Sequence, residues 1–199
     1  IANRALVCAA LADGESVLTR VPDGDDTEAM LHCLRLLGLA VERAGTTVTI
    51  AGGRGRLLPG PLTLPTRLAG TTSRFLTALA ALGPGPYTID GEPPLRRRPM
   101  APLHGALADL GVRVTALETS GCLPVTVAGP VAVDAAEIAI AGDVSSQYLT
   151  ALMLIAPYLR NGVRIRLTTA LVSRPYVEMT AAVMAAFGVP DVVVADDEI

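Results

Sequence analysis

An internal repeat of about 70 residues constrains the fold of this chain more than any other sequence feature. Apolar, helix-like stretches follow three dipeptides at that spacing: Asn3-Arg4, Ser73-Arg74 and Ser146-Gln147. A self-similar chain of this kind folds as copies of one supersecondary unit that cover one another. We therefore expect one domain, 1–199, with three units at about 1–60, 61–130 and 131–199, the last of them incomplete because it stops at VVVADDEI.

Each unit continues with a strand-like run and a second helix that is apolar on one side only. The runs lie near residues 15–21, 85–92 and 162–169. The apolar stripes, at spacings of three and four, comprise Met30, Leu34 and Leu37, then Leu103, Leu107 and Leu110, then Met179, Val183 and Phe187. A glycine follows each stripe, namely Gly38, Gly111 or Gly188, and favours a helix end there. The first helices, near 4–12, 72–82 and 146–159, are apolar nearly all round, so we expect them to be buried, with the second helices outside and three related sheets around them.

Composition narrows the classes of partner. Half of the residues are hydrophobic and 18% are charged, which is typical of a globular chain. The net charge is −3, from 16 arginines, no lysine and 19 acidic residues, and this balance argues against nucleic-acid binding. Any anion must therefore be bound by arginine, hydroxyl, amide or backbone N–H groups.

Metal, disulfide and membrane chemistry are not indicated. Cys8, Cys33 and Cys122 are odd in number and form no CxxC motif, so we expect a reducing, cytoplasmic compartment. His32 and His104 are expected on helix surfaces, and we expect no metal and no cofactor. The longest apolar run, 148–159, is too short to span a bilayer, so no membrane association is expected.

The turns that enter the first helices are the places where chemistry is expected. They are small and polar: residues 2–4, 68–74 and 142–147, the last containing Ser145 and Ser146. A helix N-terminus presents unpaired N–H groups that suit an anion, but the same hydroxyls can cap the helix, and both interpretations stay open.

The turns into the outer helices contain a second set of candidates. Asp25 and Glu28 have the spacing of a capping box. Arg98 precedes Pro99, which stiffens the backbone, so its guanidinium is suited to a carboxylate or phosphate. The third such turn contains Ser173.

These motifs together resemble the 5-enolpyruvylshikimate-3-phosphate synthase family. The resemblance rests on NRALVCAALADG, DGDDTEAML, LAGTTSRFLTALAAL, DGEPPLRRRPMAPLHGALADLGV, GDVSSQYLTAL and LVSRPYVEMT, and extends over essentially the whole chain. It implies an α/β (α+β) fold, an inside-out barrel domain of three βαβαββ repeats with buried helices. It also implies an enzyme of two such domains that transfers the enolpyruvyl group of phosphoenolpyruvate to the 5-hydroxyl of shikimate 3-phosphate, without metal or cofactor.

The resemblance assigns roles to particular residues. Ser145, Ser146 and Ser173 would hold the phosphate of shikimate 3-phosphate. Arg4 would bind its ring substituents or carboxylate, and Gln147 would lie against the ring and reach the enolpyruvyl group, with Tyr176 nearby. Gly70 would let phosphoenolpyruvate approach the backbone, and Arg98 would clamp its anionic groups. Apart from the resemblance, Arg74 is a further candidate source of positive charge.

Some parts of the family pattern are not found in the chain. The family's Gly-Ser-Lys-Ser segment would precede Ile1, Leu68 replaces an asparagine, and the acid-base groups of the second domain would lie beyond Ile199. We therefore expect no catalytic residue within this chain, a second domain as its partner, and no activity for the chain alone.

Two other functions remain as alternatives. One is half of a UDP-N-acetylglucosamine enolpyruvyl transferase, which the absence of a cysteine from the loop 90–100 argues against. The other is a non-catalytic binding module of the same fold.

Overall fold

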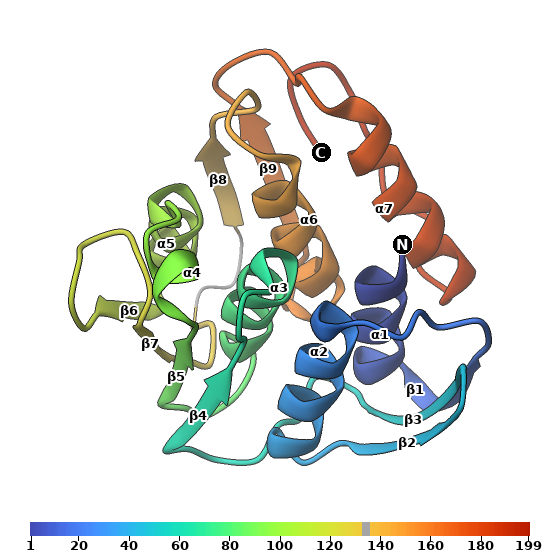
Figure 1. Ribbon diagram of the computed structural model, residues 1–199. Coiled ribbons are helices and arrows are strands. Elements are labelled where there is room, and N and C mark those ends of the chain that lie inside the picture. Colours follow the sequence, from blue (N-terminus) through green and yellow to red (C-terminus); the bar gives the residue numbers. More distant parts are fainter. Residues whose placement is uncertain (133–135) are drawn as a thin grey trace.

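The computed structural model describes residues 1–132 and 136–199, and places three sheets around a group of helices (Figure 1). The first unit contains α1 (Ala2–Leu11), β1 (Asp13–Leu18), α2 (Asp25–Leu36), β2 (Ala40–Ala44) and β3 (Thr47–Gly53). The second contains β4 (Leu62–Pro65), α3 (Gly70–Ala80), β5 (Tyr87–Asp90), α4 (Pro93–Arg96), α5 (Ala101–Asp109), β6 (Arg113–Ala116) and β7 (Val125–Ala128). The third contains β8 (Ala136–Ile140), α6 (Ser146–Ile155), the short 3₁₀ helix η1 (Ala156–Tyr158), β9 (Val163–Leu167) and α7 (Arg174–Ala186).

The sheets share one topology. The first has the strand order β1-β3-β2 and is antiparallel, and β5-β7-β6 of the second sheet repeats that arrangement. In the second sheet β4 pairs with β5 in parallel, and in the third β8 pairs with β9 in parallel. Each sheet is thus all or part of one βαβαββ pattern, which confirms the predicted fold class.

The last residues of the chain contact β9. Ile199 and Ile165 exchange two backbone hydrogen bonds, of 2.8 and 2.9 Å, and Glu198 forms an antiparallel bridge with Arg166. The pairing is antiparallel, as is the pairing of β3 with β1, but residues 189–197 form no strand. That VVVADDEI ends an incomplete third unit stays a prediction.

The first helices of the units are the core. Leu79 of α3 is 0% exposed and Leu152 of α6 is 1% exposed, as the all-round apolar pattern predicts. Helices α1, α3 and α6 contact one another, and the sheets lie at the periphery (Figure 1). The predicted stripes of α2 and α5 are also buried on their inner sides.

The prediction for α7 is only partly right. Its expected stripe, Met179, Val183 and Phe187, is half-buried, whereas Val177, Thr180 and Met184 are fully buried. The face of α7 that is turned toward the core is therefore not the predicted apolar stripe but the neighbouring one. Helix α7 packs on α1 and α6, and Thr180 on its inner side accepts a 2.8 Å hydrogen bond from the buried Arg4.

All three predicted helix ends are confirmed. Gly38, Gly111 and Gly188 have φ angles of +90°, +77° and +87°. The residue after each glycine donates its N–H to a carbonyl five residues back, as in Leu39 to Leu34 at 3.1 Å. This is the hydrogen-bond pattern that ends a helix at a left-handed residue.

Candidate functional site

The entrances of α6 and α7 lie against each other. The N–H of Asp143 donates to Thr169 Oγ1 at 3.2 Å, and the N–H of Val172 donates to the Gly142 carbonyl at 3.4 Å. Ser145 and Ser173 are the N-cap residues of the two helices. The structure thus brings the predicted phosphate-binding serines to one pair of helix N-termini, where unpaired N–H groups favour an anion.

The three serines differ in their local roles. Ser145 Oγ accepts a hydrogen bond from the N–H of Gln147 at 3.3 Å, so it caps α6 and lies at the anion-binding end of the helix. Ser173 makes no side-chain capping bond. Ser146 is 9% exposed and belongs to the first turn of α6. Capping and anion binding, the two interpretations of the sequence, are therefore compatible at Ser145.

Arg4 enters the same region from α1. Its side chain is 8% exposed, its Cζ lies 5.8 Å from the centre of the Phe75 ring, and no carboxylate forms an ion pair with it in the described residues. Burial lowers the pKa of this guanidinium from its usual value, and the proximity of Tyr176 partly offsets that effect. A buried cation without a carboxylate partner is a favourable place for an anionic ligand.

Two threonines orient Arg4. Its Nε donates to Thr180 Oγ1 at 2.8 Å and its Nη2 to Thr150 Oγ1 at 3.3 Å. Because Thr180 donates its only hydroxyl proton to the Tyr176 carbonyl at 2.8 Å, the 2.9 Å contact between the two hydroxyls must be donated by Thr150. Both hydroxyl oxygens are therefore acceptors toward Arg4, and both threonines are fully buried.

Two further cations converge on Gly70. A Cβ atom at this position would lie 2.8 Å from Arg98 Nη1 and 2.9 Å from Arg74 Nη1. Arg98 is exposed, whereas Arg74 is 8% exposed and donates to the Gly70 carbonyl at 3.0 Å. The absence of a side chain at Gly70 therefore lets two guanidinium groups lie close to the N-terminus of α3.

Gln147 joins the two groups of residues. Arg74 Nη1 donates to Gln147 Oε1 at 2.8 Å, and the backbone N–H of Gln147 contacts Ser145. Arginine has no acceptor, so the amide oxygen must face Arg74, and the amide nitrogen with its two protons remains available to a ligand. Gln147 is consequently a hydrogen-bond donor toward whatever binds between the serines and Gly70.

Sequence reasoning misses several residues of this site. It predicts Arg74 only as a general source of charge, and it does not single out Thr150 and Thr180. A signal for Arg74 exists in the repeat, because Arg4, Arg74 and Gln147 follow one another at about 70 residues, each near the start of a central helix. No sequence signal distinguishes the two threonines from other helical threonines.

Other polar candidates lie outside the site. Arg96 forms ion pairs with Asp90 and Glu118, so part of the triple-arginine run is structural. Burial raises the pKa values of the Cys8 and Cys33 thiols to about 12, which makes them poor nucleophiles. His32 is exposed as expected, whereas the same prediction for His104 is only partly right, because this residue is half-buried. Its Nε2 atom is buried without a hydrogen-bond partner in the described residues.

The capping box predicted at Asp25 and Glu28 is also wrong. Gly24 is the N-cap of α2 and makes no side-chain cap. Asp25 instead pairs with Arg67, and Glu28 pairs with Arg43. Both carboxylates thus have partners from elsewhere in the chain, which local spacing does not reveal.

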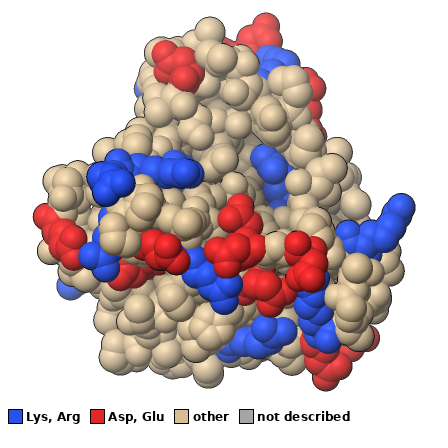
Figure 2. All heavy atoms as spheres, viewed as in Figure 1, with Lys and Arg blue, Asp and Glu red and all other residues tan. Residues whose placement is uncertain are grey.

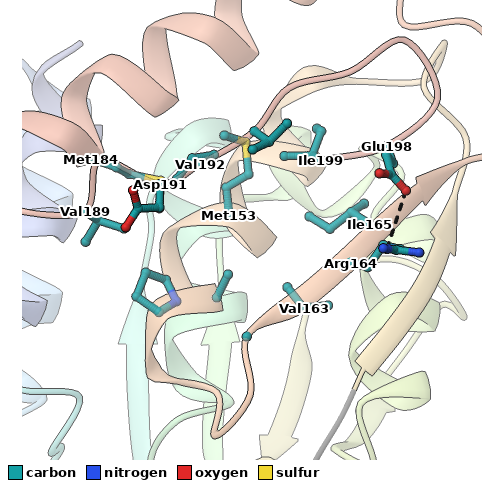
Figure 3. Close-up of a pocket in the computed structure, with 14 residues that line it drawn as sticks. Met153, Val163, Arg164, Ile165, Met184, Val189, Asp191, Val192, Glu198 and Ile199 are labelled. Carbon is teal, nitrogen blue, oxygen red and sulfur yellow. Dashed lines mark ion pairs between the residues drawn. The ribbon is translucent and has the colours of Figure 1, made fainter.

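A separate apolar cavity of about 330 Å³ lies between β9, α6, α7 and the C-terminal residues. Figure 3 shows Met153, Ile165, Met184 and Ile199 around it, with an ion pair between Arg164 and Glu198. None of the predicted site residues lines it.

Charges of both signs are mixed over the surface. Figure 2 shows acidic and basic side chains interleaved across one face, without a field of a single sign. Within residues 1–132 and 136–199, no group of three or more His, Cys, Asp or Glu side chains is placed to hold a metal. None of the helices described is both long and apolar enough to cross a bilayer.

Comparison with known proteins gives a consistent result. The family model described as EPSP synthase (3-phosphoshikimate 1-carboxyvinyltransferase) matches residues 1–197. Proteins named 3-phosphoshikimate 1-carboxyvinyltransferase from Shewanella sediminis and Rhizobium etli are 43% and 41% identical over 192 and 189 residues. These matches cover 95% and 94% of this chain but 45% and 44% of the relatives, so the chain spans less than half of their length.

Solved structures agree at the level of the fold. An EPSP synthase structure from Acinetobacter baumannii superposes with a TM-score of 0.84 at 22% sequence identity. The match covers 99% of this chain and 43% of that one.

Proposed function

Because the chain belongs to the EPSP synthase family, we propose that it forms the shikimate 3-phosphate site of an enolpyruvyl transferase. The observation that carries this proposal is the convergence of three helix entrances, one from each repeat. Arg74 donates a hydrogen bond to Gln147 of the third entrance, and Arg4 donates to Thr150 of α6 and Thr180 of α7. The helices α1, α3 and α6 that begin at these entrances contact one another. The match to this family argues against the UDP-N-acetylglucosamine alternative.

In this proposal the phosphate of shikimate 3-phosphate lies at the N-termini of α6 and α7. Ser145, Ser146 and Ser173 supply hydroxyl groups, and the first turns supply N–H groups. Arg4, held by the two threonines, binds the carboxylate or hydroxyls of the ring. A fixed guanidinium beside a helix entrance suits a small molecule with a negative charge at each end.

Phosphoenolpyruvate lies in the same proposal between Gly70 and Arg98. The bare α-carbon of Gly70 lets its anionic groups approach Arg74 and Arg98. Gln147 donates its amide protons to oxygen atoms shared by the two ligands, because its oxygen is occupied by Arg74. The second ligand would thus lie next to the first, with Gln147 between them.

The reaction requires more than this chain supplies. The 5-hydroxyl must form a C–O bond to C2 of phosphoenolpyruvate and lose its proton while C3 gains one, and phosphate must then leave as C3 gives a proton back. These transfers need a positioned acid-base group. The chain has no lysine, and neither histidine belongs to the site. We assign binding and orientation to this chain and the acid-base groups to a second domain.

The test is calorimetric titration of shikimate 3-phosphate into the polypeptide that carries this chain. Changing both Ser145 and Ser146 to alanine should weaken binding at least about tenfold, because hydrogen bonds to a charged group contribute roughly 1.5 to 3 kcal/mol each. Shikimate, which lacks the phosphate, should bind the variant and the parent equally weakly. Unchanged affinity of the variant for shikimate 3-phosphate would remove these serines from the site.

A further inference from the structure

Tyr148 lies between the two groups of site residues. It follows Gln147 on the first turn of α6 and is 1% exposed. The Cζ of Arg74 lies 5.3 Å from the centre of its ring, and its hydroxyl donates to the Pro99 carbonyl at 2.5 Å. One side chain therefore contacts both the arginine that holds Gln147 and the residue that follows Arg98.

The ring contact stabilises Arg74. This guanidinium is buried, and its Nε has no hydrogen-bond partner in the described residues. Its Nη1 bonds to the Gly70 carbonyl and to Gln147 Oε1. A cation over an aromatic face gains electrostatic attraction, which compensates in part for lost hydration. The Tyr148 ring thus helps to hold the arginine that sets the orientation of the Gln147 amide.

The hydroxyl contact stabilises the backbone beside Arg98. The N–H of Arg98 donates to the Leu95 carbonyl at 3.0 Å, and the N–H of Met100 donates to the Gly121 carbonyl at 2.7 Å. Pro99 has no N–H, and its carbonyl is fixed by Tyr148. The Arg98 side chain itself is exposed and has no ion-pair partner in the part of the chain described, so its direction depends on this backbone.

We propose that Tyr148 is a positioning residue that couples the two ligand subsites, through Arg74 to Gln147 and through Pro99 to Arg98. In this proposal the Tyr148 side chain touches neither ligand. The inference rests on the proposed function, since the subsites are those assigned to shikimate 3-phosphate and phosphoenolpyruvate. A purely structural role, in which the hydroxyl simply satisfies a buried carbonyl, makes a different prediction.

Tyr87 provides the matched control. Its ring is fully buried and its hydroxyl donates to the Leu58 carbonyl at 2.7 Å, and the residue begins β5 rather than lying at a helix entrance. Tyr148→Phe and Tyr87→Phe each remove one phenol-to-carbonyl hydrogen bond and keep the ring. The two variants should therefore lose similar amounts of thermal stability, and only one should alter ligand binding.

The experiment measures two affinities by calorimetry in the polypeptide that carries this chain. For Tyr148→Phe we expect shikimate 3-phosphate alone to bind within about twofold of the parent. Phosphoenolpyruvate titrated at saturating shikimate 3-phosphate should bind about fivefold or more weakly, as the loss of one hydrogen bond predicts. In turnover assays KM for phosphoenolpyruvate should rise while KM for shikimate 3-phosphate is unchanged. Tyr87→Phe should change none of these values.

The outcomes separate the two proposals. If the parent binds both ligands and Tyr148→Phe matches Tyr87→Phe, the coupling role of Tyr148 is wrong and the proposed function stands. If the parent binds neither ligand, the proposed function fails, and the inference fails with it. The variant Tyr148→Leu also removes the ring beside Arg74. It should lower kcat as well, because Gln147 then loses its fixed orientation. An unchanged kcat would overturn the part of the proposal that runs through Arg74.

Discussion

At the scale of the residue, the site depends on arginines whose partners are neutral. Arg4 is held by two threonines and Arg74 by a carbonyl and an amide, and no carboxylate neutralises either one in the described residues. Three arginines outside the site differ in this respect, because each forms an ion pair with a carboxylate: Arg43, Arg67 and Arg96. An arginine already paired with a carboxylate has less attraction for a ligand, so the unpaired ones are the candidates for anion binding.

Gly70→Ala tests whether phosphoenolpyruvate binds beside these arginines. The added Cβ would meet the ends of the Arg74 and Arg98 side chains at 2.9 and 2.8 Å, and these flexible ends can move without disturbing the backbone. We expect phosphoenolpyruvate to bind at least about tenfold more weakly, while the free energy of unfolding changes by less than about 1 kcal/mol.

The control for this change is Gly105→Ala. Gly105 lies within α5, and no atom comes within 4 Å of the place that an alanine Cβ would take. Alanine should therefore raise helix stability by up to about 1 kcal/mol and leave binding unchanged. Equal phosphoenolpyruvate affinities in the two variants, measured by calorimetry, would place the ligand away from Gly70.

His104 should make stability depend on pH. Burial lowers the pKa of its imidazole to about 4, against 6.5 in an exposed chain. Between those values the unfolded chain binds a proton that the folded chain does not, so the free energy of unfolding falls as pH falls from about 6.5 toward 4. Above pH 6.5 the residue contributes no pH dependence.

His104→Leu should remove this contribution. Between pH 7 and pH 5, urea unfolding should show a loss of stability that is smaller in the variant than in the parent by about 2 kcal/mol. His32→Gln, at an exposed position of α2, should behave as the parent does. The same pH dependence in parent and His104→Leu would show that the imidazole is protonated within the fold.

At the scale of the element, glycine ends the outer helices and packing orients them. Each outer helix ends at a glycine with positive φ, and the preference of glycine for this conformation is enough to predict the helix end from local sequence. The face that α7 buries is decided instead by what it packs on, since Thr180 must reach Arg4. Helix ends are therefore more predictable from this sequence than helix rotation.

Gly38→Ala should destabilise the end of α2. Its φ of +90° strains any side chain, and a Cβ would lie 2.4 Å from Leu58 Cγ. We expect a loss of about 1 to 3 kcal/mol, measured by chemical unfolding. Gly24→Ala is the control, because Gly24 has an extended φ of −171° and open space around it. A Gly38→Ala protein as stable as Gly24→Ala would mean that α2 ends differently in solution.

At the scale of the whole molecule, the three repeats contribute one helix entrance each to the same region. Arg4 comes from the first unit, Gly70, Arg74 and Arg98 from the second, and the serines with Gln147 from the third. Helices α1, α3 and α6 contact one another in the middle of the three sheets (Figure 1). The repeat thus produces both the core and the site, because equivalent positions of packed copies meet around one centre.

The amino-acid sequence alone predicts the repeat and the division into buried and outer helices. It also predicts the helix ends at glycine and the types of group that can bind an anion. They follow from local periodicity and from composition, which act over a few residues. Tertiary packing is needed to establish that Arg4 meets Thr180, that Arg74 orients the Gln147 amide and that the Nε2 atom of His104 is buried. It is needed equally for Asp25 and Glu28, which pair with arginines rather than cap α2. Those contacts join residues far apart in the chain, and a guanidinium takes whichever acceptors the packing of helices brings within reach, so no spacing along the sequence specifies its partner.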